Sequence, residues 1–426
     1  MVKRDASLDE PLWRQLAREA LARCDAIAAC SDDSGRITRL YCSPALARAH
    51  KTARPWFDEL DMAPRVDAAA NLAGCYYAAG ADRGKKLLLA SHLDSVIDAG
   101  RYDGVLGVVI GLAVVAALRA RGAKLPWGVA VIGFSDEEGV RFGTPFLGSH
   151  AVAGSFEPAL LARRDAQGVT VADALREFGC DPTGIPGCAP HPGESEIVAY
   201  LEAHIEQGPA LELGGLPLAV VDAIAGQSRL SFTFRGSGGH AGTVPMRDRR
   251  DPLIAGSRWA VEVSRRGAAT LGLTATVGHA AIDPNVPNCI PRTVTMSLDV
   301  RHANDAVRRA EAAELIEIAE AIAREERVAI GIEQHHDHGA IAMDAEWNAR
   351  LDAASTNLGL QCTTLTSGAG HDAGVMARVA PSAMLLIRSP GGVSHDPAEA
   401  VTEPDVAAAI AALTLAIEEF AAAKSS

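Results

Sequence analysis

Apolar residues in the first and last parts of the chain are spaced as in alternating strands and helices. Short apolar runs at 86–90 and 129–134 predict buried strands, and the apolar stretch 105–121 between them has helical length. Residues 12–29 and 402–420 carry apolar positions at helical spacing, and Thr402 is the expected N-cap of the second helix. The segment 180–195 is rich in proline and glycine, which predicts a surface loop. Strand, helix and strand in this order predict βαβ units and a mostly parallel sheet flanked by helices, which is an α/β fold.

The middle of the chain follows a different order. The segment RLSFTF at 229–234 alternates apolar and polar residues, as a half-buried strand does. Further elements are predicted as helix 251–266, strands 273–281 and 293–300, helix 304–327 and strand 328–333. The order β-α-β-β-α-β is typical of a ferredoxin-like α+β unit. We therefore expect an inserted domain at 215–335, within a discontinuous catalytic domain formed by 1–214 and 336–426.

Composition narrows the class of protein. The chain has 426 residues, of which 48% are hydrophobic, and a formal net charge of −13. The negative charge argues against nucleic acid or an anionic membrane surface as a partner. We expect no membrane-spanning run and no secretory signal, and eight scattered cysteines without a CxxC pair favour reduced thiols in the cytoplasm.

Two adjacent glutamates, Glu137 and Glu138, follow the strand at 129–134 in the segment FSDEEGVRFG. Successive side chains on an extended chain point to opposite sides, so a solvated turn is the ordinary interpretation. Strand ends are also where α/β enzymes place their chemistry, and this favours a division of labour between the two carboxylates. The spacing does not decide which glutamate would bind a metal and which would accept a proton.

Three histidine-containing segments supply the other candidates. His92 and Asp94, two apart at a strand end, face the same side, so Asp94 is suited to orient His92, and Asp103 follows in a glycine-rich loop. His204 lies between glutamates in YLEAHIEQGP, and His395 lies in the loop RSPGGVSHDP. Each alone has an ordinary structural role. Together they form mixed nitrogen and oxygen ligands that suit paired Zn²⁺ or Mn²⁺ ions.

Two other histidine motifs are interpreted as structural. HHDH at 335–338 is expected to be a solvated loop at the domain junction. SGAGHDA at 367–373 is expected to be a supporting loop near the site, with His371 not a ligand.

Eight ordered segments of the chain resemble the motifs of dinuclear-metal amidohydrolases that cleave ureido and N-carbamoyl groups. This family includes allantoate amidohydrolase and N-carbamoyl-L-amino-acid hydrolase, and it belongs with the aminoacylase and carboxypeptidase superfamily. The resemblance covers about residues 70–405. The segments are HLDSVIDAGRYDG, SDEEGVRFG, EAHIEQGP, GGHAGTVPM, NCIP, DVRH, SGAGHDA and GGVSHDPAE.

The resemblance implies a role for each candidate at the metal centre. It implies two divalent ions per subunit, Mn²⁺ or Zn²⁺, with Co²⁺ and Ni²⁺ as further candidates. His92 and His204 would hold one ion, Glu138 and His395 the other, and Asp103 would bridge them. Glu137 would be the general base. Peptidase relatives often carry a carboxylate in place of His204, so this histidine is similar to the ureido-cleaving branch.

The resemblance also implies that the inserted domain is a lid and a homodimer interface. His240 would stabilise the oxyanion, commonly in the active site of the partner subunit. Asn288, Arg301 and Gln207 would bind a small carboxylate-bearing ureido substrate.

The substrate itself is less sharply defined by the sequence. TVPM followed by RRDP resembles the allantoate version most closely, which implies hydrolysis of allantoate to ureidoglycine, ammonia and carbon dioxide. N-carbamoyl-L-amino acids are the alternative, together with ureidoglycolate-type and β-ureidopropionate-type substrates. A non-catalytic binding protein on a hydrolase scaffold is a third interpretation, and retention of Glu137 and all five ligands argues against it.

Overall fold

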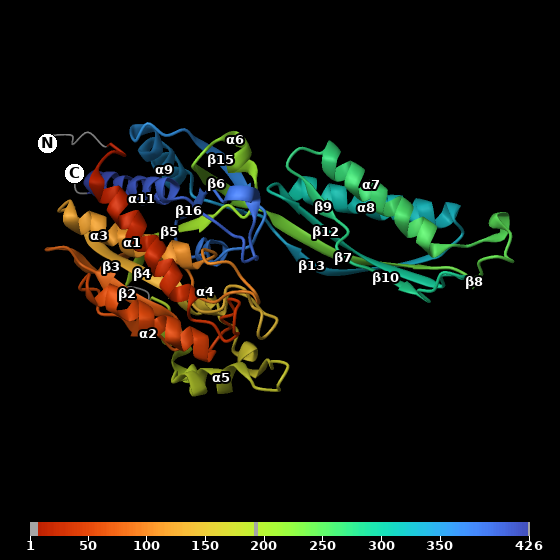
Figure 1. Cartoon of the computed structure of the whole chain (residues 1–426), viewed down its shortest axis with the longest axis horizontal. Helices are drawn as coiled ribbons and strands as arrows, with labels where there is room; N and C mark the ends of the chain where they lie inside the picture. The colour runs from red at the N-terminus through yellow and green to blue at the C-terminus, as the bar shows by residue number, and fades with distance from the viewer. Residues whose placement is uncertain (1–6, 191–194, 425–426) are drawn as a thin grey trace. The chain divides into compact units, whose positions relative to one another are not determined.

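The computed structural model describes residues 7–190 and 195–424, and the chain forms two compact units (Figure 1). Unit 1 contains the chain up to Asp222, residues 343–365 and the chain from His371 onward. Unit 2 contains Ala223–Ala342 and Thr366–Gly370.

The centre of unit 1 is a sheet in the order β1-β2-β4-β3-β5-β16-β6. The four middle strands are β4 (Trp127–Phe134), β3 (Asp82–His92), β5 (Glu196–Ile205) and β16 (Ser382–Ile387). These four run parallel, as predicted, whereas the outer strands pair antiparallel. The outer strands are β1 (Arg65–Val66), β2 (Leu72–Tyr76) and β6 (Leu218–Ile224).

Helices cover one face of this sheet and form the main core with it. α3 (Val105–Ala120) connects β3 to β4 and is buried along nearly its whole length, because it lies between the sheet and the outer helices. The helices α1 (Pro11–Ala28) and α11 (Glu403–Lys424) pack directly against it. On their outer sides, α2 (Pro44–Asp58) packs against α1, and α9 (Ala345–Asn357) packs against α11. A smaller core lies under three short helices, α4 (Leu147–Val152), α5 (Val171–Phe178) and η2 (Pro182–Cys188).

The last helix, α11, corrects the expectation that no segment could span a membrane. Its length and apolar composition suffice for a span, but most of its apolar window is buried in the core of unit 1. Its first turn follows the predicted cap, because the backbone N–H of Asp405 donates to the Thr402 hydroxyl at 3.3 Å. The apolar composition of α11 is thus explained by its burial in the core of unit 1.

Unit 2 has the strand order β10-β12-β7-β13, with every neighbouring pair antiparallel. Its two helices pack on one face, where Trp259 contacts Phe232 and donates a hydrogen bond to the carbonyl oxygen of Leu315. This is the strand order of a ferredoxin-like unit, as predicted. The elements are β7 (Gly226–Arg235), α7 (Pro252–Ala269), β9 (Thr274–Thr276), β10 (Ala280–Asp283), β12 (Thr293–His302), α8 (Asp305–Glu325) and β13 (Ala329–His338).

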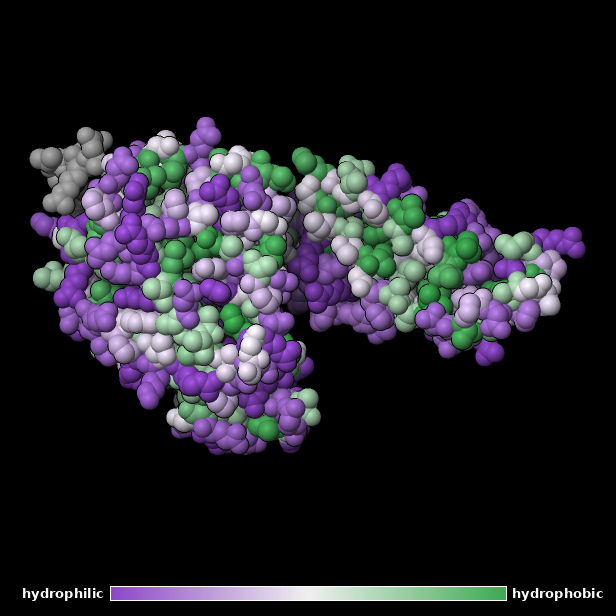
Figure 2. Space-filling model, in the orientation of Figure 1, coloured by the Kyte–Doolittle hydropathy of each residue, from purple (hydrophilic) through white to green (hydrophobic). Residues whose placement is uncertain are grey.

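Apolar residues are also exposed on unit 2. In Figure 2 they gather over α7, where Ile254 and Val261 are 48% and 65% exposed. These two residues are seven apart, so they share one side of the helix.

Three predicted elements differ from the structure. The strand expected at 273–281 is divided into β9 and β10, which both pair with β12 and are separated by the irregular segment 277–279. HHDH is solvated but is not a loop, because it forms the exposed end of β13, paired with β7 across a bulge. The loop predicted at 180–195 contains the short helix η2, and its residues 191–194 lie outside the described chain.

Candidate metal centre

The alternation of side chains along β5 and β3 places two histidines on the face of the sheet opposite the main core. Leu201, Ala203 and Ile205 pack into that core, so His204 points to the other side, where it is 1% exposed. His92 ends the neighbouring strand β3, and the two imidazole rings are 5.8 Å apart between centroids. Parallel pairing of β3 with β5 therefore brings two predicted ligands together.

Hydrogen bonds to the backbone fix both imidazole rings. Nδ1 of His92 lies 3.1 Å from the carbonyl oxygen of Asp94, and Nδ1 of His204 lies 3.0 Å from that of Ile205. A carbonyl oxygen only accepts hydrogen bonds, so each Nδ1 carries a proton, and Nε2 is the ring nitrogen that could bind a metal. Asp94 thus orients His92 through its backbone carbonyl.

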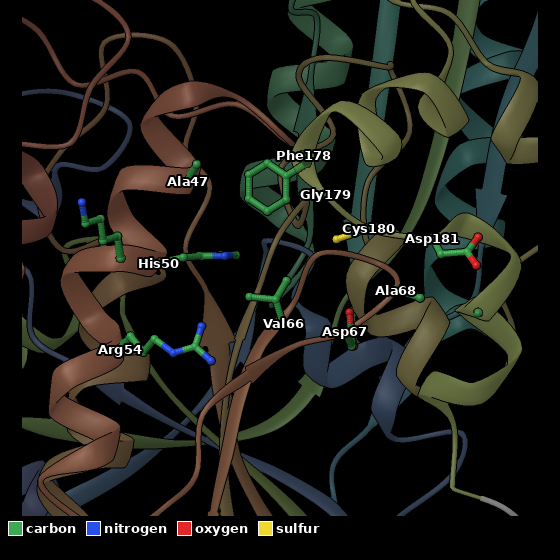
Figure 3. A pocket seen from close by; sticks show the side chains of 12 residues that line it. Ala47, His50, Arg54, Val66, Asp67, Ala68, Phe178, Gly179, Cys180 and Asp181 are labelled. Carbon is green, nitrogen blue, oxygen red and sulfur yellow. The ribbon is translucent and has the colours of Figure 1, made fainter.

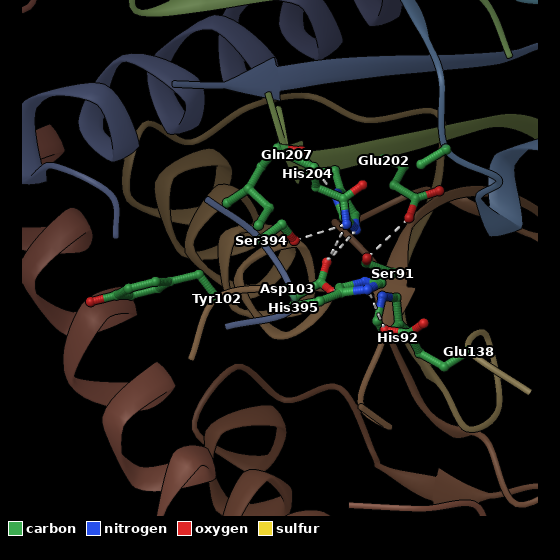
Figure 4. Close-up of polar contacts among 12 residues, drawn as sticks. Ser91, His92, Tyr102, Asp103, Glu138, Glu202, His204, Gln207, Ser394 and His395 are labelled. Atoms are coloured by element: carbon green, nitrogen blue, oxygen red, sulfur yellow. Dashed lines mark hydrogen bonds and ion pairs between the residues drawn. The ribbon is translucent and has the colours of Figure 1, made fainter. Parts of the chain in front are cut away.

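Asp103 lies between two histidines, with one carboxylate oxygen near each (Figure 4). Oδ1 is 3.4 Å from Nε2 of His204, and Oδ2 is 3.1 Å from Nε2 of His395. Gly104 follows with a φ of 67°, and a Cβ there would collide with the ring of His92. The glycine is therefore required both by the left-handed backbone and by the close approach.

Both glutamates of the EE pair reach the cluster because the chain turns sharply after β4. The Asp94 carboxylate accepts the backbone N–H of Glu137 at 3.0 Å and that of Glu138 at 3.1 Å. Oε1 of Glu138 is 3.4 Å from Nε2 of His395. One potential metal-ligand atom from each of Glu137, Glu138 and His92 lies within 4.8 Å of the other two. The solvated-turn interpretation is wrong, since Glu137 is buried.

Burial and mutual repulsion raise the pKa values of the two glutamates. Burial raises the pKa of Glu138 to about 7 and that of Glu137 well above its usual range, with neighbouring carboxylates adding to both shifts. Burial would also raise the pKa of Asp103, but the hydrogen bond from His395 and the charges of His204 and His92 lower it below its usual range.

The side chains suit a pair of divalent cations. Among the described residues, Oε1 of Glu138 and Nε2 of His204 are buried without a hydrogen-bond partner. Overlapping groups of ligand atoms are formed by His92, Asp103 and His204 and by Asp103, Glu138 and His395, with Asp103 in both. Imidazole nitrogens and carboxylate oxygens are the ligands preferred by Zn²⁺ and Mn²⁺, and bound cations would offset the repulsion among the buried carboxylates.

The loops around the cluster contain a carboxylate to which the sequence assigned no role. Glu399 accepts the backbone N–H groups of Tyr102 at 2.7 Å and of Asp103 at 3.0 Å, and it also accepts a hydrogen bond from Ser394. It thereby links the loop of Asp103 to the loop of His395. No spacing rule could have found it, because it is 296 residues from Asp103.

Gln207, predicted to bind substrate, lies beside the cluster with a left-handed φ of 60°. Its side-chain amide donates to Oδ1 of Asp103 at 3.1 Å and to the Ser394 hydroxyl at 3.2 Å. His371 packs edge-on against His204, with ring centroids 4.6 Å apart, so its loop lies at the site as expected.

The other predicted substrate residues belong to unit 2 and fall into two places. His240 lies on β8 (Gly239–His240), which pairs with β11 (Cys289–Ile290), so Asn288 is next to it. Arg301 lies near the far end of β12, and eight residues of strand from Thr293 span roughly 26 Å. Its guanidinium is held by Asp299 and by the carbonyl oxygen of Gly368.

Replacement of Asp94 by asparagine is expected to weaken metal binding, although Asp94 is not itself a predicted ligand. The carboxylate accepts two N–H groups of the EE turn, whereas an amide keeps only one oxygen acceptor. We expect metal affinity or kcat/KM to fall by roughly 10–100-fold. Titration of the metal-free protein with Mn²⁺ measures the affinity, and an unchanged affinity together with unchanged turnover would contradict this role.

Comparison with known proteins gives the same family over most of the chain. The family model described as Peptidase family M20/M25/M40 matches residues 88–419. Allantoate deiminase 2 of Glycine max is 37% identical, covering 96% of this chain and 91% of that protein. An N-carbamoyl-L-amino acid amidohydrolase of Geobacillus stearothermophilus is also 37% identical, with coverages of 88% and 91%. A crystal structure of a hydantoinase/carbamoylase family amidase from Burkholderia multivorans matches with a TM-score of 0.88 at 30% identity, covering 95% of this chain and 98% of that one.

Proposed function

Because the chain belongs to peptidase family M20/M25/M40, we propose that it is a metal-dependent amidohydrolase that cleaves a linear ureido C–N bond. The observation that carries the proposal is the convergence of five ligand-type side chains beside Glu137. These are His92, Asp103, Glu138, His204 and His395. The curated relatives at 37% identity are named for allantoate and for N-carbamoyl-L-amino acids, and both substrates contain a ureido group.

We assign His92 and His204 to one ion, Glu138 and His395 to the other, and Asp103 to both. Its two carboxylate oxygens face different histidines, as a bridge requires. When bound, such an ion pair would polarise the ureido carbonyl and acidify a water molecule between the ions.

Glu137 is the proposed general base, and its burial beside the metal ligands supports this role. Its carboxylate is buried, and burial together with Glu138, Asp372 and Asp94 raises its pKa above the usual range for glutamate. A buried carboxylate beside the metal ligands, itself assigned to neither ion, can accept the proton of a water molecule and pass it on to the leaving nitrogen. Gln207 donates a hydrogen bond to the Asp103 carboxylate and is itself held by the Ser394 hydroxyl, so the side chain of Asp103 is fixed beside the proposed base.

For unit 2 we propose the role of a lid that also joins two subunits. Within one subunit, the place formed by His240 and Asn288 is separated from Arg301 by most of the length of β12. This distance is too long for both places to contact one small substrate. Two copies would allow His240 of one subunit to act on the oxyanion at the other subunit's site, while Arg301 binds the substrate carboxylate. The exposed apolar side of α7 would supply part of such an interface.

Allantoate is the substrate we propose first, for a cytoplasmic enzyme. It carries one carboxylate for Arg301 and two ureido arms, and hydrolysis of one arm would release ammonia and carbon dioxide and leave ureidoglycine. TVPM followed by RRDP, at 243–252, supports allantoate over N-carbamoyl-L-amino acids.

The test is ammonia release by protein stripped of metal and reloaded with Mn²⁺ or Zn²⁺. Allantoate is compared with a panel of N-carbamoyl-L-amino acids, and turnover of allantoate alone is expected. Turnover of the carbamoyl panel instead would keep the mechanism and reject the allantoate assignment. Absence of turnover on every ureido compound with both ions bound would reject the proposed function.

A further inference from the structure

Unit 2 has a cavity on the face of its sheet that α7 and α8 do not cover. It has a volume of about 710 Å³ and is lined by side chains of β7, β9, β12 and β13, and its lining residues all belong to unit 2. This size is within the range of small-molecule sites. Leu298 and Val300 pack into the core of unit 2, so Asp299 and Arg301, which alternate with them on β12, point into the cavity.

The charge of this cavity differs from that of the cavity in unit 1, which lies between α2 and the segment joining α5 to η2 (Figure 3). The unit 1 cavity has two carboxylates against one lysine and one arginine, and both ring nitrogens of its His50 are buried out of reach of a ligand. The described residues that line the unit 2 cavity include two arginines, Arg229 and Arg301, against one carboxylate, Asp299. An anion is therefore favoured in the unit 2 cavity.

Asp299 is the centre of a hydrogen-bond network in this cavity. Its Oδ1 accepts from Nε of Arg301 at 2.8 Å, and its Oδ2 accepts from Nη2 of the same guanidinium at 3.1 Å. Oδ2 also accepts from Nε of Arg229 at 2.9 Å and from the side-chain amide of Gln227 at 2.7 Å. The register explains the network, because Arg229 and Gln227 on β7 lie opposite Asp299 and Arg301 on β12.

The carboxylate of Asp299 is ionised near pH 7. Burial would raise the pKa of Asp299, but the hydrogen bonds from Arg301 and Arg229 lower it below its usual range. The three side chains together therefore carry one net positive charge.

The guanidinium of Arg301 is held on two sides and keeps two donors. A guanidinium has five N–H groups. Nε and Nη2 donate to Asp299, and Nη1 donates to the carbonyl oxygen of Gly368 at 2.6 Å. Within the described chain, these bonds leave one N–H group on each terminal nitrogen. Arg301 lines the cavity with 29% of its side chain exposed, and two such N–H groups can bind both oxygens of a carboxylate.

Asp299 has two opposite effects on a carboxylate bound at Arg301. Its own charge repels the ligand, but Asp299 is 26% exposed and is shared with Arg229, and interactions between partly exposed charges are weak. An unrestrained arginine side chain, in contrast, loses much rotamer freedom when it binds a ligand. Because Asp299 fixes Arg301 beforehand, the gain from positioning should exceed the repulsion.

We propose that Asp299 is a positioning residue, which holds Arg301 so that its two remaining N–H groups bind the substrate carboxylate. The proposal rests on the proposed function, in which Arg301 binds that carboxylate. Asp299 would contact the arginine and not the substrate. Arg229 and Gln227 would in turn hold Asp299.

The test is the preference of the metal-loaded full chain for a carboxylate over a carboxamide. The kcat/KM for allantoate is divided by that for its primary carboxamide; if only carbamoyl compounds are turned over, an N-carbamoyl-L-amino acid and its carboxamide are used. In Asp299→Asn we expect KM for the carboxylate to rise about tenfold, the loss of one well-placed charge contact, with kcat almost unchanged. The carboxamide should be affected little, because it lacks the charge that Arg301 binds.

A second background separates positioning from general damage to the fold. In Arg301→Ala the preference is expected to be lost already. Adding Asp299→Asn to that variant should leave the preference unchanged or raise it, because without Arg301 the Asp299 carboxylate can only repel the substrate carboxylate. Asp352→Asn, the same change at an exposed position of α9 outside unit 2, should behave as the unmodified protein.

Three results would overturn the proposal while the ureido activity stands. They are an unchanged preference in Asp299→Asn, a lower KM for the carboxylate in that variant, and an equal loss on both substrates. Should Asp299→Asn fail to fold, Asp299→Ser removes the same acceptor pair and is read in the same way. Absence of turnover of every ureido compound by the unmodified protein would instead reject the proposed function, and this inference with it.

Discussion

Replacement of Glu137 by glutamine is expected to lower kcat by about 10²–10⁴-fold, the usual contribution of a general base. Glutamine has almost the same shape as glutamate but cannot accept the proton. The five proposed ligands remain, and the N–H groups of the EE turn still donate to Asp94. Metal content, measured by elemental analysis of the purified variant, should therefore stay at two ions per subunit.

A matched control is available on the same sheet. Glu196→Gln makes the same chemical change at the exposed start of β5, where the glutamate forms an ion pair with Lys85. It should retain full activity and metal content. If Glu137→Gln kept normal turnover, the base would be another group; if it lost one ion, Glu137 would be a ligand, and Glu138 would become the candidate base.

Replacement of Asp103 by asparagine is expected to abolish turnover for a different reason, the loss of metal. Its two carboxylate oxygens lie 3.4 Å and 3.1 Å from the imidazoles of His204 and His395. An amide has one oxygen with lone pairs and one NH₂ group, so it cannot bridge two cations. We expect at most one ion per subunit and background activity.

The comparison variant is Asp98→Asn, in the same loop. Asp98 has a left-handed φ of 58°, a conformation that asparagine also tolerates, and it belongs to no group of metal-ligand atoms among the described residues. Its metal content and turnover should match those of the unmodified protein. Two tightly bound ions in Asp103→Asn would contradict the bridging assignment, even if activity were low.

These two variants distinguish loss of proton transfer from loss of metal binding. Glu137→Gln should be a fully loaded, inactive protein, and Asp103→Asn an under-loaded one. Added Mn²⁺ should therefore restore neither activity nor proton transfer in the first variant. In the second, excess Mn²⁺ should raise occupancy only partly, because one ligand to each ion has been weakened.

The sequence by itself determined the elements and most of their order. Side-chain period is a local property, so α3, β4, α11 and the ferredoxin-like order of unit 2 could be predicted from the spacing of apolar residues. The residue pattern identified the candidate ligands and the motif resemblance implied their roles, and the structure brings all five into one cluster. The exposed end of β13 was missed because HHDH is polar, and only pairing with β7 makes it a strand.

Only the tertiary structure decided which distant groups meet. Parallel pairing of β3 with β5 and of β5 with β16 brings His204, near the end of β5, together with the loops of Asp103 and His395 at one edge of the sheet. The same long-range packing places Glu399 under Asp103 and leaves both nitrogens of the buried His50 without a partner in the described chain. None of these contacts has a local signature, because each depends on strand order and helix packing across hundreds of residues. The sequence therefore identified the reactive residues. The packing of the folded chain determined the distances between them, the shifts of their pKa values and which of their polar atoms lack a hydrogen-bond partner.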